Sequence, residues 1–231
     1  MHRFVNLRGQ FNSVMSLHLY FFKKMISYLN KNKSENLQIA FSGGADSIAA
    51  AFYLRHKKPL LKHFNHKFCK EDDGIEEKCR FFAEKFNFDI EIGYSNDKYS
   101  KGSTEDWCRK QRYDWFKNLG GVLITCHNLS EATESYLMNC FNGKNEYLPI
   151  PLETTFGKTK VIRPFILNSK DEINNFLKRN DLTKFIAEDP LNLDLTRRRN
   201  WIRMVLLPQI KEKTNVEKVV KKKYLEKLKK V

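Results

Sequence analysis

The chain has 231 residues, of which 41% are hydrophobic, so composition excludes a disordered chain and allows one core of roughly 180–200 residues. Its 42 basic and 27 acidic residues leave a net charge of +15, which indicates a polyanionic partner, either nucleic acid or an acidic membrane surface. No run approaches the roughly 18 apolar residues that span a bilayer, so we expect no membrane-embedded segment. We expect a cytoplasmic protein, and the acid-free N-terminus is also compatible with an organellar presequence.

The chain has five cysteines, an odd number, and no Cys-x-x-Cys pair. This spacing argues against a zinc ribbon, a disulfide framework and a paired redox site. We expect reduced, mostly buried thiols. They are Cys69, Cys79, Cys108, Cys126 and Cys140.

We divide the chain into an N-terminal extension with an amphipathic helix at Val14–Leu29 (1–34), a main domain (35–168), a helical subregion (169–210) and a Lys-rich tail (211–231). In the main domain, apolar strand-like runs alternate with segments of helical periodicity. The expected strands are Leu37–Phe41, Leu60–Asn65, Phe88–Ile92, Val122–Thr125 and Val161–Ile162. The expected helices are Ala45–Leu54, Glu76–Phe86, Thr104–Leu119 and Ser130–Phe141. Such alternation predicts an α/β fold with a doubly wound, mainly parallel, five-stranded sheet.

The first strand leads directly into Ser42-Gly43-Gly44-Ala45-Asp46-Ser47. Two glycines before a helix N-terminus form a concave nest of backbone N–H groups that suits an anion. Asp46 would repel a phosphate, but it suits the Mg²⁺ that accompanies a nucleotide. The alternative is an ordinary Gly-rich turn with a solvated aspartate.

Ligands of doubly wound sheets bind at the carboxyl ends of the strands. This rule groups Ser42–Ser47 with three other polar segments: Asn65-His66, Cys126-His127-Asn128 and Arg163-Pro164. Glu131 and Glu134 follow at i, i+3, so both carboxylates share a helix face near this edge. They could share a metal with Asp46 or hold the ammonium of an amine substrate, or they could simply complement the helix dipole.

One helix concentrates arginines and aromatic residues at Trp107, Arg109, Arg112, Tyr113 and Trp115. Such a face could stack an RNA base or pack in a core. We expect packing for Tyr113 and Trp115 and a ligand contact for Arg109.

The pattern changes after Ser169. A capping-box sequence opens a helix at Asp171–Asn180, followed by a loop at Ala187–Leu195 and a basic helix at Arg198–Ile210, interrupted at Pro208. The tail, 211–231, holds nine lysines and three glutamates. A single apolar stripe runs along this tail, formed by Val216, Val219, Val220, Tyr224 and Leu228.

The glycine loop resembles the phosphate loop of the N-type ATP pyrophosphatases. Within that superfamily, the segment from Asp189-Pro190 to Arg199-Asn200-Trp201-Ile202-Arg203 is similar to the signature of the tRNA(Ile)-lysidine synthetase family. Glu105-x-x-Cys108-Arg109-x-x-Arg112-Tyr113 and Ile162-Arg163-Pro164 resemble two further motifs of that family. The similarity spans about residues 20–210.

The resemblance implies an adenine nucleotide alpha hydrolase-like fold and a two-step reaction on the wobble cytidine of a tRNA with a CAU anticodon. ATP would adenylate the cytosine 2-oxygen, and the ε-amine of L-lysine would then displace AMP. The implied catalytic residues are Asp46, His127, Glu131, Glu134 and Arg109, with Mg²⁺ on Asp46 and Glu131. The implied ATP-binding residues are Ser42, Gly43, Gly44, Asp46, Ser47 and His66. The implied tRNA-binding or active-site-loop residues are Arg112, Arg163, Asn192, Arg199, Asn200 and Arg203.

The chain departs from the family pattern at Asn128, where the family has His, at Ser130, where it has Asp, and conservatively at Glu131. It also has no room for the larger C-terminal tRNA-binding domains of many members, and we expect the Lys-rich tail to supply part of that function. The alternatives are a PP-loop enzyme with another amine or sulfur donor, an inactive anticodon-loop-binding relative, and a small-molecule amide synthetase. The oligomeric state stays open, with a homodimer allowed.

Overall fold

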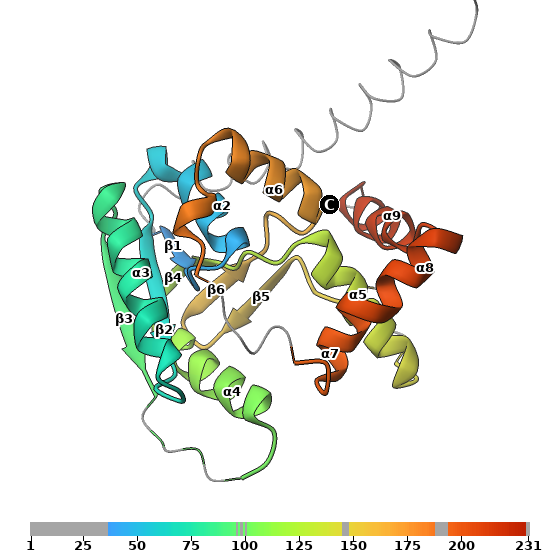
Figure 1. The fold of residues 1–231 in the computed structure, drawn as a ribbon, viewed down its shortest axis with the longest axis horizontal. Helices are drawn as coiled ribbons and strands as arrows, with labels where there is room; N and C mark the ends of the chain where they lie inside the picture. Colours follow the sequence, from blue (N-terminus) through green and yellow to red (C-terminus); the bar gives the residue numbers. More distant parts are fainter. Residues whose placement is uncertain are drawn as a thin grey trace, which may run out of the picture.

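The computed structural model describes residues 37–95, 97, 99, 101–144, 148–187 and 194–229. Within this part of the chain, six strands form one sheet in the order β3-β2-β1-β4-β6-β5 (Figure 1). The strands are β1 (Leu37–Ala40), β2 (Leu60–Asn65), β3 (Ile90–Tyr94), β4 (Gly121–Ile124), β5 (Glu153–Phe156) and β6 (Thr159–Ile162). All neighbours pair in parallel except β5 and β6. The doubly wound, mainly parallel α/β fold is confirmed, and the count of five strands is wrong by one.

The additional strand, β5, is an antiparallel edge strand that turns into β6 through Gly157 at φ 54°. Its sequence, Glu-Thr-Thr-Phe, alternates exposed and half-buried positions. An edge strand of this kind has no apolar run, which is why hydrophobic periodicity did not reveal it.

Two other boundaries moved for local reasons. β3 begins two residues later than expected, because Asn87 takes a left-handed conformation and the Phe88 N–H donates to Ala83 O, which ends the preceding helix. That helix begins at Glu71 instead of Glu76. Its first turn carries acidic residues, which the helix dipole stabilises there.

The helices of the main domain are α2 (Ala45–Tyr53), α3 (Glu71–Lys85), α4 (Thr104–Phe116) and α5 (Leu129–Phe141). They are followed by α6 (Lys170–Arg179), α7 (Arg198–Trp201), a π-helical segment (Ile202–Leu206), α8 (Leu207–Lys213) and α9 (Val216–Lys229), with short 3₁₀ turns at Arg55–Lys57 and Thr183–Phe185. Helices α2, α3 and α6 cover one face of the sheet, where Ile39, Phe82 and Leu177 share a core. Helix α4 covers the other face with Phe116 against Leu123.

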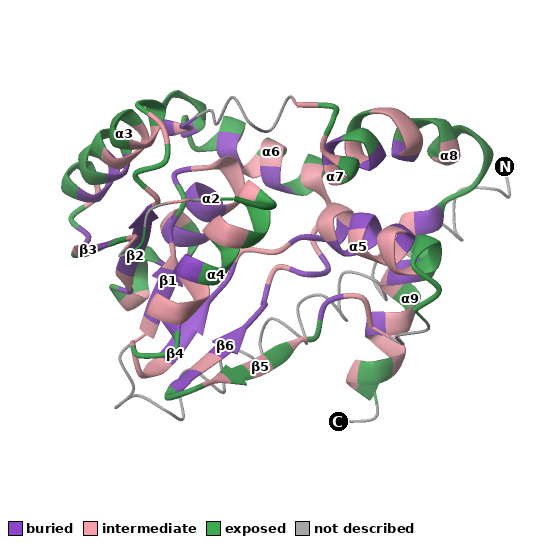
Figure 2. Ribbon diagram, turned by 90° about the horizontal axis from the view of Figure 1, so that it is seen from below, coloured by how far each residue is buried: buried purple, intermediate pink, exposed green. Residues whose placement is uncertain are grey.

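The C-terminal helices gather beside α5 at one end of the sheet (Figures 1 and 2). Val220 and Tyr224 of α9 are completely buried against Leu129 and Ala132 of α5, while Val219, placed on the apolar stripe by periodicity, is exposed. The Lys-rich segment is therefore packed into the body of the protein through its apolar stripe. None of the described helices is long and apolar enough to cross a membrane.

The basic helix is interrupted just before Pro208 and not at Pro208 itself. Pro208 lies in the first turn of α8, and the irregular segment is the π-helix just before it. A proline cannot donate to the carbonyl four residues earlier and clashes with it, which favours widened turns upstream.

The described cysteines are all free, but only Cys79 is buried, so the expectation of mostly buried thiols is wrong. The amphipathic helix expected at Val14–Leu29 and the candidate residue Asn192 lie outside the described residues.

Candidate active site at the switch point of the sheet

The sheet reverses its winding at β1, which pairs with β2 on one side and with β4 on the other. In doubly wound folds, ligands bind in the crevice at such a switch point. The Ser42–Ser47 loop leaves the end of β1, and His127 and Asn128 follow β4. The topology therefore brings two of the segments singled out from the sequence to one place.

The turn of the Ser42–Ser47 loop requires glycine at position 43. Gly43 lies at φ 76°, and an added Cβ would meet Cys79 Sγ at 2.9 Å and Ala187 Cβ at 3.1 Å, so only glycine fits. The Ser47 hydroxyl donates to Gly44 O at 2.9 Å and lies 3.3 Å from the Ser42 hydroxyl. The Ala187 N–H donates to Gly43 O at 2.9 Å, which ties the loop to the chain just before residues 188–193.

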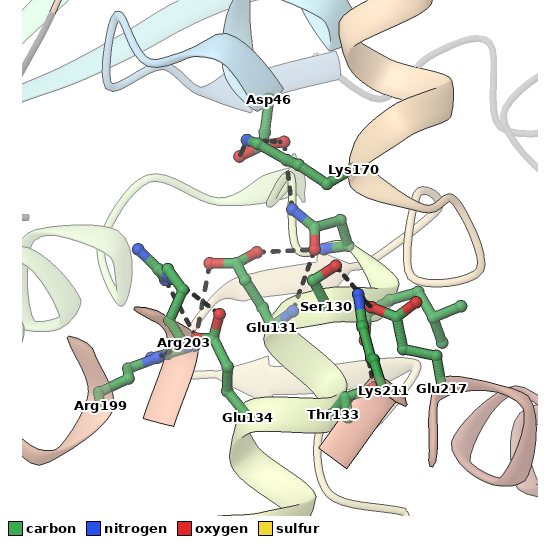
Figure 3. A network of polar contacts seen from close by, with 12 residues as sticks. Asp46, Ser130, Glu131, Thr133, Glu134, Lys170, Arg199, Arg203, Lys211 and Glu217 are labelled. Atoms are coloured by element: carbon green, nitrogen blue, oxygen red, sulfur yellow. Dashed lines mark hydrogen bonds and ion pairs between the residues drawn. The ribbon is translucent and has the colours of Figure 1, made fainter. Parts of the chain in front are cut away.

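Asp46, in the first turn of α2, accepts two side-chain donors from other parts of the chain (Figure 3). Lys170 Nζ lies 2.9 Å and 2.8 Å from its two carboxylate oxygens, and Asn128 Nδ2 lies 3.1 Å from Oδ1. Lys170 was not singled out from the sequence, and Asn128 was singled out only as part of the segment after the fourth expected strand and as a departure from the family pattern, because neither pairing with Asp46 is visible in local sequence.

Asn128 joins Asp46 to the start of α5. Its side chain accepts from the Glu131 N–H at 3.0 Å, and Glu131 Oε2 accepts from the Asn128 N–H at 3.1 Å, which completes a capping box. Burial raises the pKa of Glu131, Arg199 opposes that shift, and Asp46 adds to it by repulsion. Asn128, the first of the departures noted in the sequence, is thus the N-cap of α5 and a hydrogen-bond donor to Asp46.

Glu134 lies one turn later and is 1% exposed, and both of its carboxylate oxygens accept hydrogen bonds (Figure 3). It accepts from Arg199 Nε at 3.0 Å and from Arg203 Nε and Nη2 at 2.7 Å and 3.0 Å. The two arginines lie four residues apart at the start of the basic helix, so both reach the same carboxylate. Glu134 therefore holds two candidate RNA- or adenylate-binding arginines in position.

His127 lies among arginines from three elements. Burial lowers its pKa to about 3, with further lowering by Arg163, Arg199, Arg112 and Arg109, so the ring is neutral at pH 7. Its Nδ1 lies 3.0 Å from the Thr125 hydroxyl. Within the described residues, two buried guanidinium nitrogens near this ring, Arg163 Nε and Arg199 Nη2, have no hydrogen-bond partner. Both guanidinium groups also have protein partners, Arg163 at Pro151 O and Arg199 at Glu134, so the unsatisfied N–H of each is a donor that suits an additional anionic ligand.

The remaining candidates of α4 and β2 lie around this cluster. Arg112 is half-buried and interacts electrostatically with both His127 and His66. His66, at the end of β2, has its pKa lowered to about 4 by burial and by Arg112. Arg109 is exposed, with its guanidinium 5.4 Å from the centre of the Tyr113 ring. Tyr113 packs on Phe156 and Trp115 packs on Phe64, so the expectation that these two residues pack is confirmed.

Asn200 supports the neighbouring loop. It is buried, and its Nδ2 donates to Asp194 O at 2.9 Å. The Asp194 carboxylate also accepts from the Thr196 N–H at 2.9 Å. This part of the signature therefore shapes the chain directly after residues 188–193.

The sequence departure at Ser130 has a structural counterpart on α9. The Ser130 hydroxyl donates to Glu217 Oε1 at 2.9 Å, and Lys211 Nζ lies 2.9 Å from the same oxygen. A carboxylate thus lies next to position 130, although it comes from a helix 87 residues further along the chain.

Arg163 is positioned by a chain of contacts that begins on α9. The Tyr224 hydroxyl donates to Ile150 O at 2.6 Å and accepts from the Ile150 N–H at 3.2 Å. The next carbonyl, Pro151 O, accepts from Arg163 Nη1 at 3.0 Å. Tyr224 was known from the sequence only as part of an apolar stripe, and its hydroxyl had no predicted partner.

For Mg²⁺, the structure offers the hard oxygen ligands that this ion prefers, on Asp46 and Glu131. No group of three or more His, Cys, Asp or Glu side chains within the described ranges is arranged to hold a metal. Two carboxylates fit Mg²⁺, which usually takes one or two protein carboxylates and completes its shell with water and phosphate oxygens.

The neutral histidines predict a pH-dependent stability. His127 and His66 bind protons in the unfolded chain near pH 6.5, but in the folded protein only near pH 3 and pH 4. Stability should therefore fall as the pH drops below about 6.5, by up to about 1.4 kcal/mol per pH unit for each histidine. Urea unfolding at pH 7 and pH 5 should show a smaller loss for His66→Gln and His127→Gln than for the unmodified chain. Equal losses in all three proteins would contradict the assignment.

Comparison with known proteins places the chain in a family. The model of the PP-loop domain matches residues 17–210, which is most of the chain. The chain belongs to the PP-loop domain family. The Ser42–Ser47 segment, which resembles a PP-loop in sequence, lies within the matched residues.

The curated relatives share a name. The chain is 30% identical over 196 residues to the tRNA(Ile)-lysidine synthase of Mycoplasma mycoides, covering 78% of this chain and 48% of the relative. It is 29% identical over 212 residues to the tRNA(Ile)-lysidine synthase of Persephonella marina, covering 82% and 45%. The chain thus spans less than half the length of these relatives.

Solved structures agree on the fold. The U34-tRNA thiolase NcsA from Methanococcus maripaludis aligns with a TM-score of 0.64 at 16% identity, over 85% of this chain and 74% of that one. The NH₃-dependent NAD synthetase from Campylobacter jejuni aligns with a TM-score of 0.51 at 13% identity, over 92% and 93%. At these identities the likeness concerns the fold alone.

Proposed function

We propose that this chain carries the catalytic unit of a tRNA(Ile)-lysidine synthase. It would use ATP to adenylate the 2-oxygen of the wobble cytidine in a CAU anticodon, releasing pyrophosphate. The ε-amine of L-lysine would then attack C2 of the base, lose a proton and displace AMP. The names of the curated relatives support this reading, as does the order of the PP-loop and the arginine motif along the chain.

The single observation that carries the proposal is the meeting of two sites at one sheet edge. The PP-loop supplies backbone N–H groups for a pyrophosphate. At the same edge, Arg163 and Arg199 lie near the neutral His127, and each has one buried N–H group without a hydrogen-bond partner. Such donors suit the second anionic region of the reaction, the α-phosphate that is transferred and the RNA backbone next to it.

Asp46 and Glu131 would hold Mg²⁺, which when bound neutralises charge that develops on the leaving pyrophosphate. The residues of the chain do the rest. The PP-loop amides fix the pyrophosphate, and Arg163 and Arg199 stabilise the transferred phosphate while His127 stays neutral beside it. The target cytidine must leave its stack to reach this crevice.

Of the two glutamates, Glu131 is the better candidate to orient the amine. Its side chain is 26% exposed, so a ligand can reach it. Glu134 is committed to three N–H donors and is buried, so its role is to position Arg199 and Arg203.

The tRNA itself would contact the basic C-terminal helices. The exposed lysines of α9 include Lys218, Lys222 and Lys227, which face away from the buried stripe. Lysine side chains on a helix surface supply phosphate contacts without reading sequence. A tRNA substrate would place the enzyme in the cytoplasm or in an organelle that holds tRNA.

The test is a labelling reaction with ATP, labelled L-lysine and a CAU-anticodon tRNA transcript. We expect lysine-dependent AMP release with label on the RNA, and loss of both in Asp46→Asn but not in the surface control Asp171→Asn. Transfer from a sulfur donor instead of lysine would identify a thiolation enzyme on the same fold. Adenylation of a small molecule without RNA would identify an amide synthetase, and RNA binding without AMP release would identify an inactive relative; each of these outcomes contradicts the proposal.

A further inference from the structure

Lys170 occupies a position that its own helix does not favour. It is the first residue of α6, where the positive end of the helix dipole disfavours a cation. The capping box of this helix is complete without it, since Ser169 and Glu172 satisfy each other's backbone N–H groups. A reason for a lysine here must therefore come from outside α6.

That reason is Asp46. The ammonium of Lys170 contacts both oxygens of this carboxylate, at 2.9 Å and 2.8 Å, across 124 residues of sequence. The pair is accessible to a ligand, since the side chains are 41% and 25% exposed. The ammonium thus stands at the carboxylate that we assign to Mg²⁺, in the first turn of the helix that follows the PP-loop.

We infer that the Lys170 ammonium neutralises Asp46 in the absence of nucleotide. When the metal–nucleotide complex binds, the ammonium moves from Asp46 to the phosphates. This inference rests on the proposed use of ATP and Mg²⁺, and not on the RNA or the amine. Without nucleotide, the ammonium neutralises Asp46 and competes with a free divalent ion. With nucleotide, the flexible four-carbon stem of Lys170 lets the ammonium turn to a phosphate oxygen held by the neighbouring nest.

Two consequences of opposite sign follow. Removing the ammonium should strengthen binding of a divalent ion alone, because the carboxylate loses its competitor. The same change should weaken binding of the metal–nucleotide, because a phosphate loses a charge-assisted hydrogen bond. A lysine that merely stabilised the fold would change both affinities in the same direction or neither.

The experiment compares Lys170→Met with the unmodified chain, using Mn²⁺ alone by electron paramagnetic resonance and Mg²⁺ with α,β-methylene ATP by calorimetry. For Lys170→Met we expect Mn²⁺ to bind about 5-fold tighter and the nucleotide about 10-fold weaker or more. Lys170→Arg, which keeps the charge, should retain most nucleotide affinity. Lys178→Met, on the exposed last turn of the same helix, should change neither value.

Any other pattern in Lys170→Met overturns the inference, provided that thermal unfolding shows a folded variant. If Lys170→Met does not fold, Lys170→Gln is measured in the same two assays and the same opposite signs are required. A failure of the unmodified chain to bind the nucleotide at all would instead count against the proposed function, so the two failures are distinguishable.

Discussion

Replacing Glu134 with glutamine should destabilise the protein by about 3 kcal/mol, because two arginines would lose the buried carboxylate that they share. Glu134 is 1% exposed and accepts three N–H donors, which one amide oxygen cannot replace. For a chain of this size, such a loss corresponds to a fall in Tm of roughly 6–12 °C. Chemical denaturation at pH 7 measures the change directly.

The matched control is Glu153→Gln. Its ion pair with Lys160 spans 3.1 Å at the edge of the sheet, and the carboxylate is 67% exposed, so we expect a loss of about 0.5 kcal/mol or less. Arg203→Gln combined with Glu134→Gln should recover part of the stability, since one unpaired guanidinium is removed. A Glu134→Gln variant as stable as the control would show that the carboxylate does not hold the arginines.

Replacing Tyr224 with alanine should cost about 3–5 kcal/mol, because a completely buried aromatic side chain of α9 would leave a cavity against α5. Tyr224→Phe keeps the packing but leaves the N–H and C=O of Ile150 without the hydroxyl. We therefore expect a smaller loss of stability, about 1–3 kcal/mol. Because Ile150 precedes the carbonyl that binds Arg163, both variants should also lower the rate of AMP release.

Charge reversal on the same helix separates packing from RNA binding. Lys218→Glu with Lys222→Glu changes exposed residues, so the melting temperature should stay within a few degrees while tRNA affinity and its salt dependence both fall. Val219→Ala, at an exposed apolar position, should alter neither. Unchanged tRNA affinity in the charge-reversal variant would remove α9 from the proposed RNA-binding surface.

Local features of the fold were readable from the sequence because they depend on neighbours in the chain. The Gly43 turn, the strand Leu60–Asn65 and the capping box at Ser169 follow from conformational freedom, apolar runs and side-chain reach over three residues. The edge strand β5 was not predicted because it is mostly polar and has no apolar run. Its pairing with β6 forms only in the folded hairpin.

The α/β class, the glycine turn after the first strand and the polar residues at the strand ends all follow from the sequence alone. The pairing of polar side chains from distant elements is visible only in the folded protein: Lys170 with Asp46, Glu134 with Arg199 and Arg203, and the Tyr224 hydroxyl with Ile150. These partners lie 65 to 124 residues apart. Periodicity reports which face of an element is buried, but the choice of partner for a buried charge depends on where packing brings distant elements together.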